Sequence, residues 1–165
     1  MSCLEVLFAN RWIVEKNLSI LTWGNVSKIE RDKGLLLIKP SGADLDKISE
    51  HDIATVEIST GQKVSGLKPS VDTDIHLELY RGFKDIGSVV HTHSVYATAF
   101  AQANKSIPCL GTTHADYFYG EIPCVPQPTP VELEEDYERH TGRKIVEYFK
   151  YFDLNPNHIP AALVA

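Results

Sequence analysis

The chain has 165 residues, of which 43% are hydrophobic and 23% are charged. This composition is typical of one compact globular domain. The formal net charge of −6 argues against broad binding to nucleic acid or to membrane surfaces, although a local pocket could still be positive.

Three cysteines, Cys3, Cys109 and Cys124, are present without CxxC spacing. This pattern predicts free thiols in a reducing cytoplasm rather than a disulfide framework. The first residues show no basic segment followed by an apolar segment, and no run of about 18 apolar residues occurs. We therefore expect neither a signal peptide nor a membrane span.

Hydrophobic periodicity predicts a helix over about residues 4–17, followed by a loop that contains TWGNVS, residues 22–27. Apolar runs closed by turn residues predict strands over 34–40 and 52–60. A helix with acidic residues in its first turn is expected over 72–83. Residues 87–94 then predict a strand, and Ser94 could cap a helix over 95–104.

Residues 107–123 form a segment rich in Gly, Thr and aromatic residues, which we interpret as a loop. The sequence TPVE, Thr129 to Glu132, is a capping box that predicts a helix start. That helix should extend to about Phe152, and Thr141–Gly142 could introduce a break. The apolar segment 158–165 resembles a strand. These elements predict a single α/β or α+β domain with a central sheet and flanking helices. Because the chain ends inside a predicted strand, we expect the domain to be incomplete at its C-terminus.

His91 and His93 stand at the end of a predicted strand, where positions i and i+2 point to one face. This geometry suits two imidazoles that bind one metal ion, although two core or surface histidines with satisfied rings remain the alternative. A catalytic zinc site needs about three protein ligands. Asp72 could supply an oxygen ligand, and His76, one helical turn later, is a weaker alternative.

Two stretches, IKPSGAD and KPSVDTD, each carry Lys-Pro-Ser. Proline fixes the entry to each loop, serine offers a hydroxyl, and the following amides could converge on an anion. Each stretch could equally be an ordinary turn, because Gly, Pro, Asn and Ser dominate turns for local reasons. Together with the two histidines, they indicate a metal beside an anion pocket.

The motifs LTWGNVS, IKPSGAD, KPSVDTDIH, VVHTHSVYAT and GTTHADYFYGEIPC occur in this order. From about Thr22 onward, this set resembles the class II aldolase/epimerase family. GTTHADYFYG is similar to the branch that epimerises L-ribulose 5-phosphate at C4, and differs from the loop of the fuculose- and rhamnulose-phosphate aldolases. The resemblance implies a central, mostly antiparallel sheet flanked by helices, within one domain that covers residues 1–165.

The resemblance also implies roles for individual residues. His91, His93 and Asp72 match the zinc site, and Asp116 matches a catalytic acid/base. The matches to the substrate and phosphate pocket are Gly24, Asn25, Lys39, Ser41, Gly42, Ser70 and Val71. Val71 replaces a serine of the family, so one hydroxyl contact to the phosphate should be lost. The third zinc histidine and a C-terminal tyrosine that partners the catalytic aspartate are expected beyond Ala165. His158 is expected in an exposed loop.

The expected reaction is conversion of L-ribulose 5-phosphate to D-xylulose 5-phosphate through zinc-assisted retro-aldol cleavage of the C3–C4 bond. One proton-transfer group is needed on each face of the aldehyde fragment. The alternatives are a class II sugar-phosphate aldolase and a non-catalytic aldolase-like interaction module. The resemblance further implies one Zn²⁺ per subunit, a phosphorylated pentulose as substrate and a cytoplasmic homotetramer.

Overall fold

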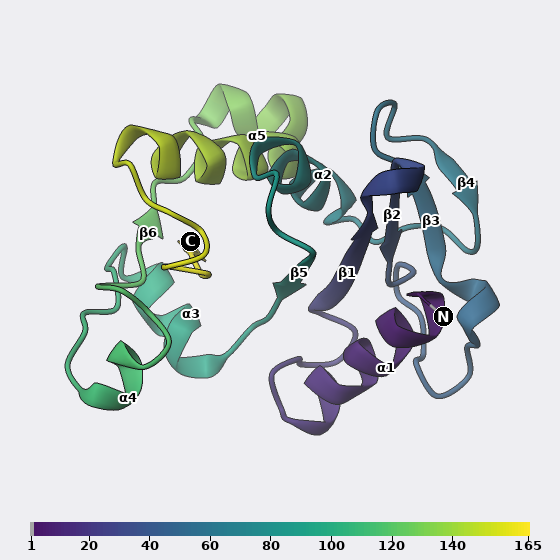
Figure 1. The fold of residues 1–165 in the computed structure, drawn as a ribbon, viewed down its shortest axis with the longest axis horizontal. Coiled ribbons are helices and arrows are strands. Elements are labelled where there is room, and N and C mark those ends of the chain that lie inside the picture. Colours follow the sequence, from purple (N-terminus) through teal and green to yellow (C-terminus); the bar gives the residue numbers. More distant parts are fainter. Residues whose placement is uncertain (1) are drawn as a thin grey trace.

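A five-stranded antiparallel sheet forms the centre of the protein (Figure 1). The computed structural model describes residues 2–165. The strand order is β4-β3-β2-β1-β5, and the strands are β1 (Asn25–Glu30), β2 (Leu35–Ile38), β3 (Ala54–Glu57), β4 (Lys63–Ser65) and β5 (Ser88–His91). The helices are α1 (Ser2–Glu15), α2 (Thr73–Gly82), α3 (Val95–Gln102), α4 (Thr112–Ala115) and α5 (Pro130–Tyr151). The antiparallel sheet flanked by helices confirms the predicted fold class.

Three smaller features complete the element order. Two short 3-10 helices occur at η1 (Arg31–Lys33) and η2 (Glu50–Asp52). Strands β6 (Cys124–Val125) and β7 (Leu163–Val164) pair in parallel as a separate ribbon. Within residues 2–165, no helix is long and apolar enough to cross a membrane.

Strand β2 separates two cores because successive side chains of a strand point to opposite faces. Leu36 and Ile38 are fully buried and pack on one face with Leu77 of α2. Leu37 points to the other face, where it packs with Val6 of α1. Helices α1 and α2 therefore cover opposite faces of the sheet.

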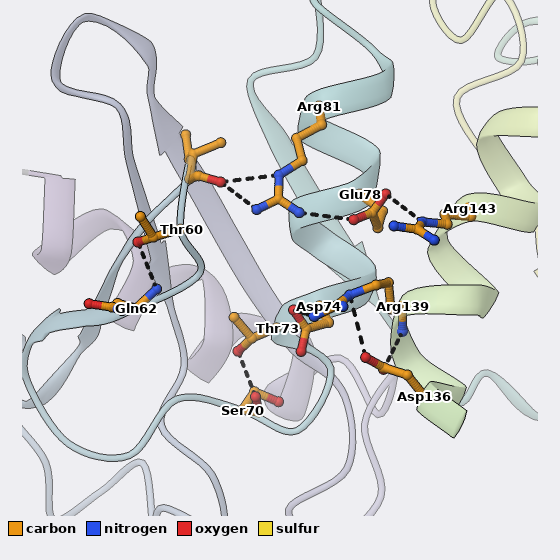
Figure 2. Close-up of polar contacts among 11 residues, drawn as sticks. Thr60, Gln62, Ser70, Thr73, Asp74, Glu78, Arg81, Asp136, Arg139 and Arg143 are labelled. Carbon is orange, nitrogen blue, oxygen red and sulfur yellow. Dashed lines mark hydrogen bonds and ion pairs between the residues drawn. The ribbon is translucent and has the colours of Figure 1, made fainter. Parts of the chain in front are cut away.

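Helix α5 packs against the outer side of α2. Ion pairs support this contact, since Glu78 of α2 bonds both Arg81 and Arg143, and Arg139 of α5 approaches Asp74 (Figure 2). The predicted start of α5 is confirmed, because Thr129 and Glu132 form the capping box.

The predicted break at Thr141–Gly142 is wrong. The non-helical residue of α5 is Asp136, with φ −165° and ψ 84°. Gly142 serves a different purpose: a Cβ added there would lie 2.8 Å from Cβ of Glu78 and 2.9 Å from the carbonyl oxygen of Ile75. The glycine therefore allows a close approach of α5 to α2.

Two other sequence expectations need correction. The loop predicted over residues 22–27 ends at Gly24, because Asn25 already begins strand β1. The segment 107–123 contains the short helix α4 and a single bridge between Ile107 and Ile122, so it is not wholly irregular. Both elements carry many polar residues, which obscures the hydrophobic pattern on which strand and helix prediction depends.

Candidate functional site

Two neighbouring strands bring the histidine pair and Asn25 together. Strands β1 and β5 pair in a register that sets Asn25 opposite His91. His91 ends β5, and the ring centroids of His91 and His93 lie 4.9 Å apart with an interplanar angle of 37°. Gly24 allows this close pairing, because its φ is +80° and a Cβ there would lie 2.9 Å from the carbonyl oxygen of His91.

Asp72 directs its carboxylate at the same place. Its Oδ2 accepts a hydrogen bond of 2.5 Å from Nδ2 of Asn25 and lies 3.2 Å from Nδ1 of His91. Burial alone would raise the pKa of Asp72, but the contact with His91 and the hydrogen bond from Asn25 outweigh it and lower that pKa to about 2. Asp72 is therefore a carboxylate at neutral pH, held against an imidazole.

The donor types at this place suit zinc, which binds imidazole nitrogen and carboxylate oxygen. Nδ1 of His91 is buried and, among the described residues, has no hydrogen-bond partner of good geometry, in spite of its contact with Asp72. Over residues 2–165, however, no group of three His, Cys, Asp or Glu side chains converges as a ready metal site. His91 and His93 are thus the residues that could hold a zinc ion, with Asp72 beside them.

The two Lys-Pro-Ser stretches lie side by side, although 29 positions separate them in the chain. Pro40 and Pro69 form an antiparallel bridge. The Ser41 amide donates to the carbonyl oxygen of Lys68 at 2.9 Å, and the Ser70 amide donates to that of Lys39 at 3.1 Å. The hydroxyl of Ser70, in turn, accepts from Nδ2 of Asn25 at 3.2 Å. The pairing connects the predicted anion pocket directly to the histidine pair.

Lys39 is the buried cation of this pocket, and its Nζ donates to the carbonyl oxygen of Thr22 at 2.9 Å. Burial lowers the pKa of Lys39, and the charge of Asp72 partly opposes that effect. Lys39, Thr22, Gly24 and Gly42 line a pocket of about 480 Å³. Val71, by contrast, is 62% exposed and carries no polar side chain.

Asp116 lies apart from these residues. It follows α4 directly and is exposed, and α4 stands well away from the ends of β1 and β5 (Figure 1). Within one chain, the structure therefore does not bring Asp116 to Asp72 and the histidine pair. His158 is exposed, as predicted, and its carbonyl oxygen accepts from the Tyr119 amide at 2.9 Å.

The sequence does not reveal a buried polar cluster directly beneath the site. Its members are Ser27 of β1 and His76 and Tyr80 of α2. Burial lowers the pKa of His76 to about 3, so its ring is neutral at physiological pH. The one available signal is the i, i+4, i+8 spacing of Asp72, His76 and Tyr80, which places them on one face of α2.

Comparison with known proteins identifies the family. The family described as "Class II Aldolase and Adducin N-terminal domain" matches residues 5–165, so the chain belongs to it. The structure is also similar to an L-fuculose 1-phosphate aldolase, with a TM-score of 0.71, 22% identity and coverage of 92% of this chain and 86% of that one.

Two further solved structures share the fold. YgbL from Klebsiella pneumoniae, a putative aldolase/epimerase/decarboxylase, has a TM-score of 0.69 and 23% identity over 93% of this chain and 70% of that one. The L-fuculose-1-phosphate aldolase from Thermus thermophilus has a TM-score of 0.67 and 24% identity over 87% of this chain and 68% of that one. At such identities these likenesses establish the fold alone.

Proposed function

We propose that the chain carries the catalytic site of a zinc-dependent sugar-phosphate enzyme that epimerises L-ribulose 5-phosphate to D-xylulose 5-phosphate. The observation that carries the proposal is the junction of Asn25, Asp72 and His91 beside the paired Lys-Pro-Ser stretches. It unites imidazole and carboxylate donors with serine hydroxyls, backbone amides and a buried lysine. The resemblance of GTTHADYFYG to the epimerase branch supports this choice of reaction.

The substrate dictates the bond that breaks. Its carbonyl is at C2, so the C4 hydrogen is not acidic, but the C4 hydroxyl is β to the carbonyl. Loss of the hydroxyl proton breaks the C3–C4 bond and gives a dihydroxyacetone enediolate and glycolaldehyde phosphate. Rotation of the aldehyde and re-formation of the bond on its opposite face invert C4, so no atom is gained or lost.

Each group has a task in this scheme. When bound by His91 and His93, zinc would supply Lewis-acid stabilisation of the negative charge beside the carbonyl. Lys39, Ser41, Gly42 and Ser70, with Gly24, Asn25 and Val71 beside them, would hold the phosphate, so that the aldehyde fragment stays bound while it rotates. Asp116 would move the proton at the C4 hydroxyl.

The position of Asp116 bears on assembly. Because Asp116 lies away from the histidine pair of its own chain, we propose that subunits of a cytoplasmic homotetramer complete each other's sites. The three free cysteines fit a reducing compartment. The third zinc histidine and the C-terminal tyrosine expected after residue 165 stay predictions. Light scattering of the purified protein tests the assembly.

A class II sugar-phosphate aldolase is the second candidate, favoured by the printed names of the similar structures, which include L-fuculose 1-phosphate aldolases and a sugar-phosphate aldolase from Thermotoga maritima. The family description also includes adducin, which keeps a non-catalytic interaction module as a third reading.

One experiment separates these functions. Zinc-loaded protein is incubated with L-ribulose 5-phosphate or with L-fuculose 1-phosphate, and the products are followed by ¹³C NMR. The proposal expects D-xylulose 5-phosphate from the first substrate and no cleavage of the second. Release of dihydroxyacetone phosphate and lactaldehyde from the second substrate would instead identify an aldolase, and no turnover of either would support the interaction module.

A further inference from the structure

Ser27, His76 and Tyr80, called the Ser27 cluster below, form a polar contact inside the apolar core. Oγ of Ser27 lies 2.6 Å from Nδ1 of His76 and 2.9 Å from the hydroxyl of Tyr80. That hydroxyl also donates to the carbonyl oxygen of Ser27 at 3.1 Å. The three residues are 0%, 1% and 2% exposed. Polar groups buried so deeply are stable only when they stay paired.

The cluster is the second of two polar contacts between the same strand and helix. Asn25 and Ser27 share one face of β1, and Asp72, His76 and Tyr80 share one face of α2. Two residues of a strand rise about 6.6 Å and four residues of a helix rise about 6.0 Å, so contacts at these intervals stay aligned. The Asn25–Asp72 bond and the Ser27 cluster therefore form successive contacts of one alignment between β1 and α2.

This alignment decides the geometry of the candidate site. His91 belongs to β5, and its position is fixed by pairing with Asn25 of β1. Asp72 belongs to the start of α2, and its position is fixed by how α2 lies on β1. A shift of α2 along β1 would separate Asp72 from His91 and would also leave Ser27 and His76 buried without partners. Apolar contacts are non-directional and penalise such a shift less sharply.

The cluster also reaches the site itself. Asp72, His76 and His91 line one cavity of about 440 Å³. Nε2 of His76 is buried there and has no hydrogen-bond partner within residues 2–165, so the hydrogen bonding of the ring comes from the Ser27 side.

We propose that the Ser27 cluster positions the candidate zinc site, with His76 as the central positioning residue that holds Asp72 against His91 by fixing α2 on β1. The proposal rests on the proposed function only where zinc is concerned. The proposal predicts that a substitution that removes a polar contact of the Ser27 cluster lowers zinc affinity more than a core substitution that costs the same stability.

The test compares Ser27→Ala and Tyr80→Phe with Val56→Ala. Val56 lies on β3 and packs in the same apolar cluster as Tyr80, but its side chain makes no hydrogen bond, so this variant removes apolar packing alone. Zinc affinity of folded protein is measured by competition with a chromophoric chelator. Ser27→Ala should weaken zinc binding by roughly 10- to 100-fold, as removal of groups that orient metal ligands usually does. Tyr80→Phe should act in the same direction but less, and Val56→Ala should leave affinity within about twofold.

A pair of variants at His76 isolates the ring nitrogen. His76→Asn keeps a polar amide where Nδ1 meets Ser27, and His76→Phe removes it. The Asn variant should retain most of the zinc affinity, and the Phe variant should match Ser27→Ala. Equal affinity in the two His76 variants would overturn the role of the Ser27–His76 bond.

A second readout needs no zinc. In metal-free protein, the ¹³Cγ shift of Asp72 and the ring shifts of His91 report their contact. These shifts should move in Ser27→Ala and stay in Val56→Ala. If they do so but the wild type binds no zinc, the proposed function fails and the positioning role stands. If shifts and zinc affinity both stay at wild-type values in Ser27→Ala and Tyr80→Phe, the cluster is a stability element only.

Discussion

Asp72 stands at the start of α2, where a carboxylate would usually accept hydrogen bonds from the first amides of the helix. Its side chain makes no such capping bond. It accepts instead from Asn25 and contacts His91, so its charge is directed at the neighbouring strands. Helix α2 therefore lacks a capping hydrogen bond that ordinarily contributes about 1 kcal/mol of stability. Such a loss is typical of residues that serve a functional site rather than their own helix.

Asp116 carries the first prediction at this scale. Asp116→Asn keeps the size of the side chain but removes the proton-accepting oxygen, so epimerisation should fall by roughly 10²- to 10⁴-fold. Zinc content and thermal unfolding should stay at wild-type values, because Asp116 is exposed and is not a proposed ligand. Turnover by NMR and zinc by elemental analysis check this. Unchanged turnover would remove Asp116 from the mechanism, and lost zinc would make it a ligand.

Gly24 carries the second prediction at the residue scale. Gly24→Ala should lower the free energy of unfolding by about 2–3 kcal/mol, because φ is +80° and the new Cβ would meet the His91 carbonyl oxygen at 2.9 Å. Gly34→Ala is the matched control: φ is +67° there, but no atom lies within 4 Å of an added Cβ. Gly34→Ala should lower the free energy of unfolding by about 1–2 kcal/mol. Urea titration measures both, and equal losses would show that the contact with His91 costs nothing.

At the scale of elements, the sequence reveals the parts with strong local signals. The capping box at Thr129 fixes the start of α5. His91 and His93 lie close together where β5 ends, with ring centroids 4.9 Å apart, although His93 itself lies beyond the strand. Strand β1 escapes prediction because NVSKIE is mostly polar, and its buried face pairs with polar residues of α2. The Ser27–His76 contact joins residues 49 positions apart, so no local pattern announces it.

Gly142 shows the same limit for helix packing. Glycine has a low helix propensity, so a glycine inside a helix predicts a break. Gly142 instead lies where α5 closely contacts α2. Gly142→Ala should gain up to about 1 kcal/mol of helix propensity but lose about 1–3 kcal/mol through overpacking against Glu78 and Ile75. We expect a net loss of stability in thermal unfolding. Glu147→Ala, on the exposed face of α5, is the control and should change stability by less than about 0.5 kcal/mol. A net gain for Gly142→Ala would mean that the two helices can separate freely.

At the scale of the whole molecule, strand β1 is the common reference of the site. It pairs with β2 and β5 on its two edges and meets α2 through Asn25 and Ser27. Helix α1 contacts it as well, because Nδ2 of Asn10 donates to the Val26 carbonyl oxygen at 3.0 Å. The residues proposed to bind metal and phosphate thus depend on one strand whose polar face is buried. Acid should disturb this arrangement before it disturbs the apolar cores.

The acid sensitivity of folding tests this view. The pKa of His76 is about 3 in the folded protein, because burial disfavours the charged ring, against about 6.5 in the unfolded chain. Between these values the unfolded chain binds a proton that the folded protein does not, so stability is full above pH 6.5 and falls as pH drops. The slope should approach 1.4 kcal/mol per pH unit.

Asp72 and Glu132, with pKa values of about 2 in the folded protein, lose their contributions only below about pH 4.5. Urea unfolding of metal-free protein at pH 7.5, 6.5, 5.5 and 5.0 therefore reports on the buried histidines, which are His76 and, to a smaller extent, His93, whose pKa is also lowered by burial. The wild type should lose stability steadily below pH 6.5, and His76→Asn should show a shallower decline because its amide does not titrate. Identical slopes in the two proteins would assign the acid sensitivity to other groups and would mean that burial of a neutral His76 does not govern it.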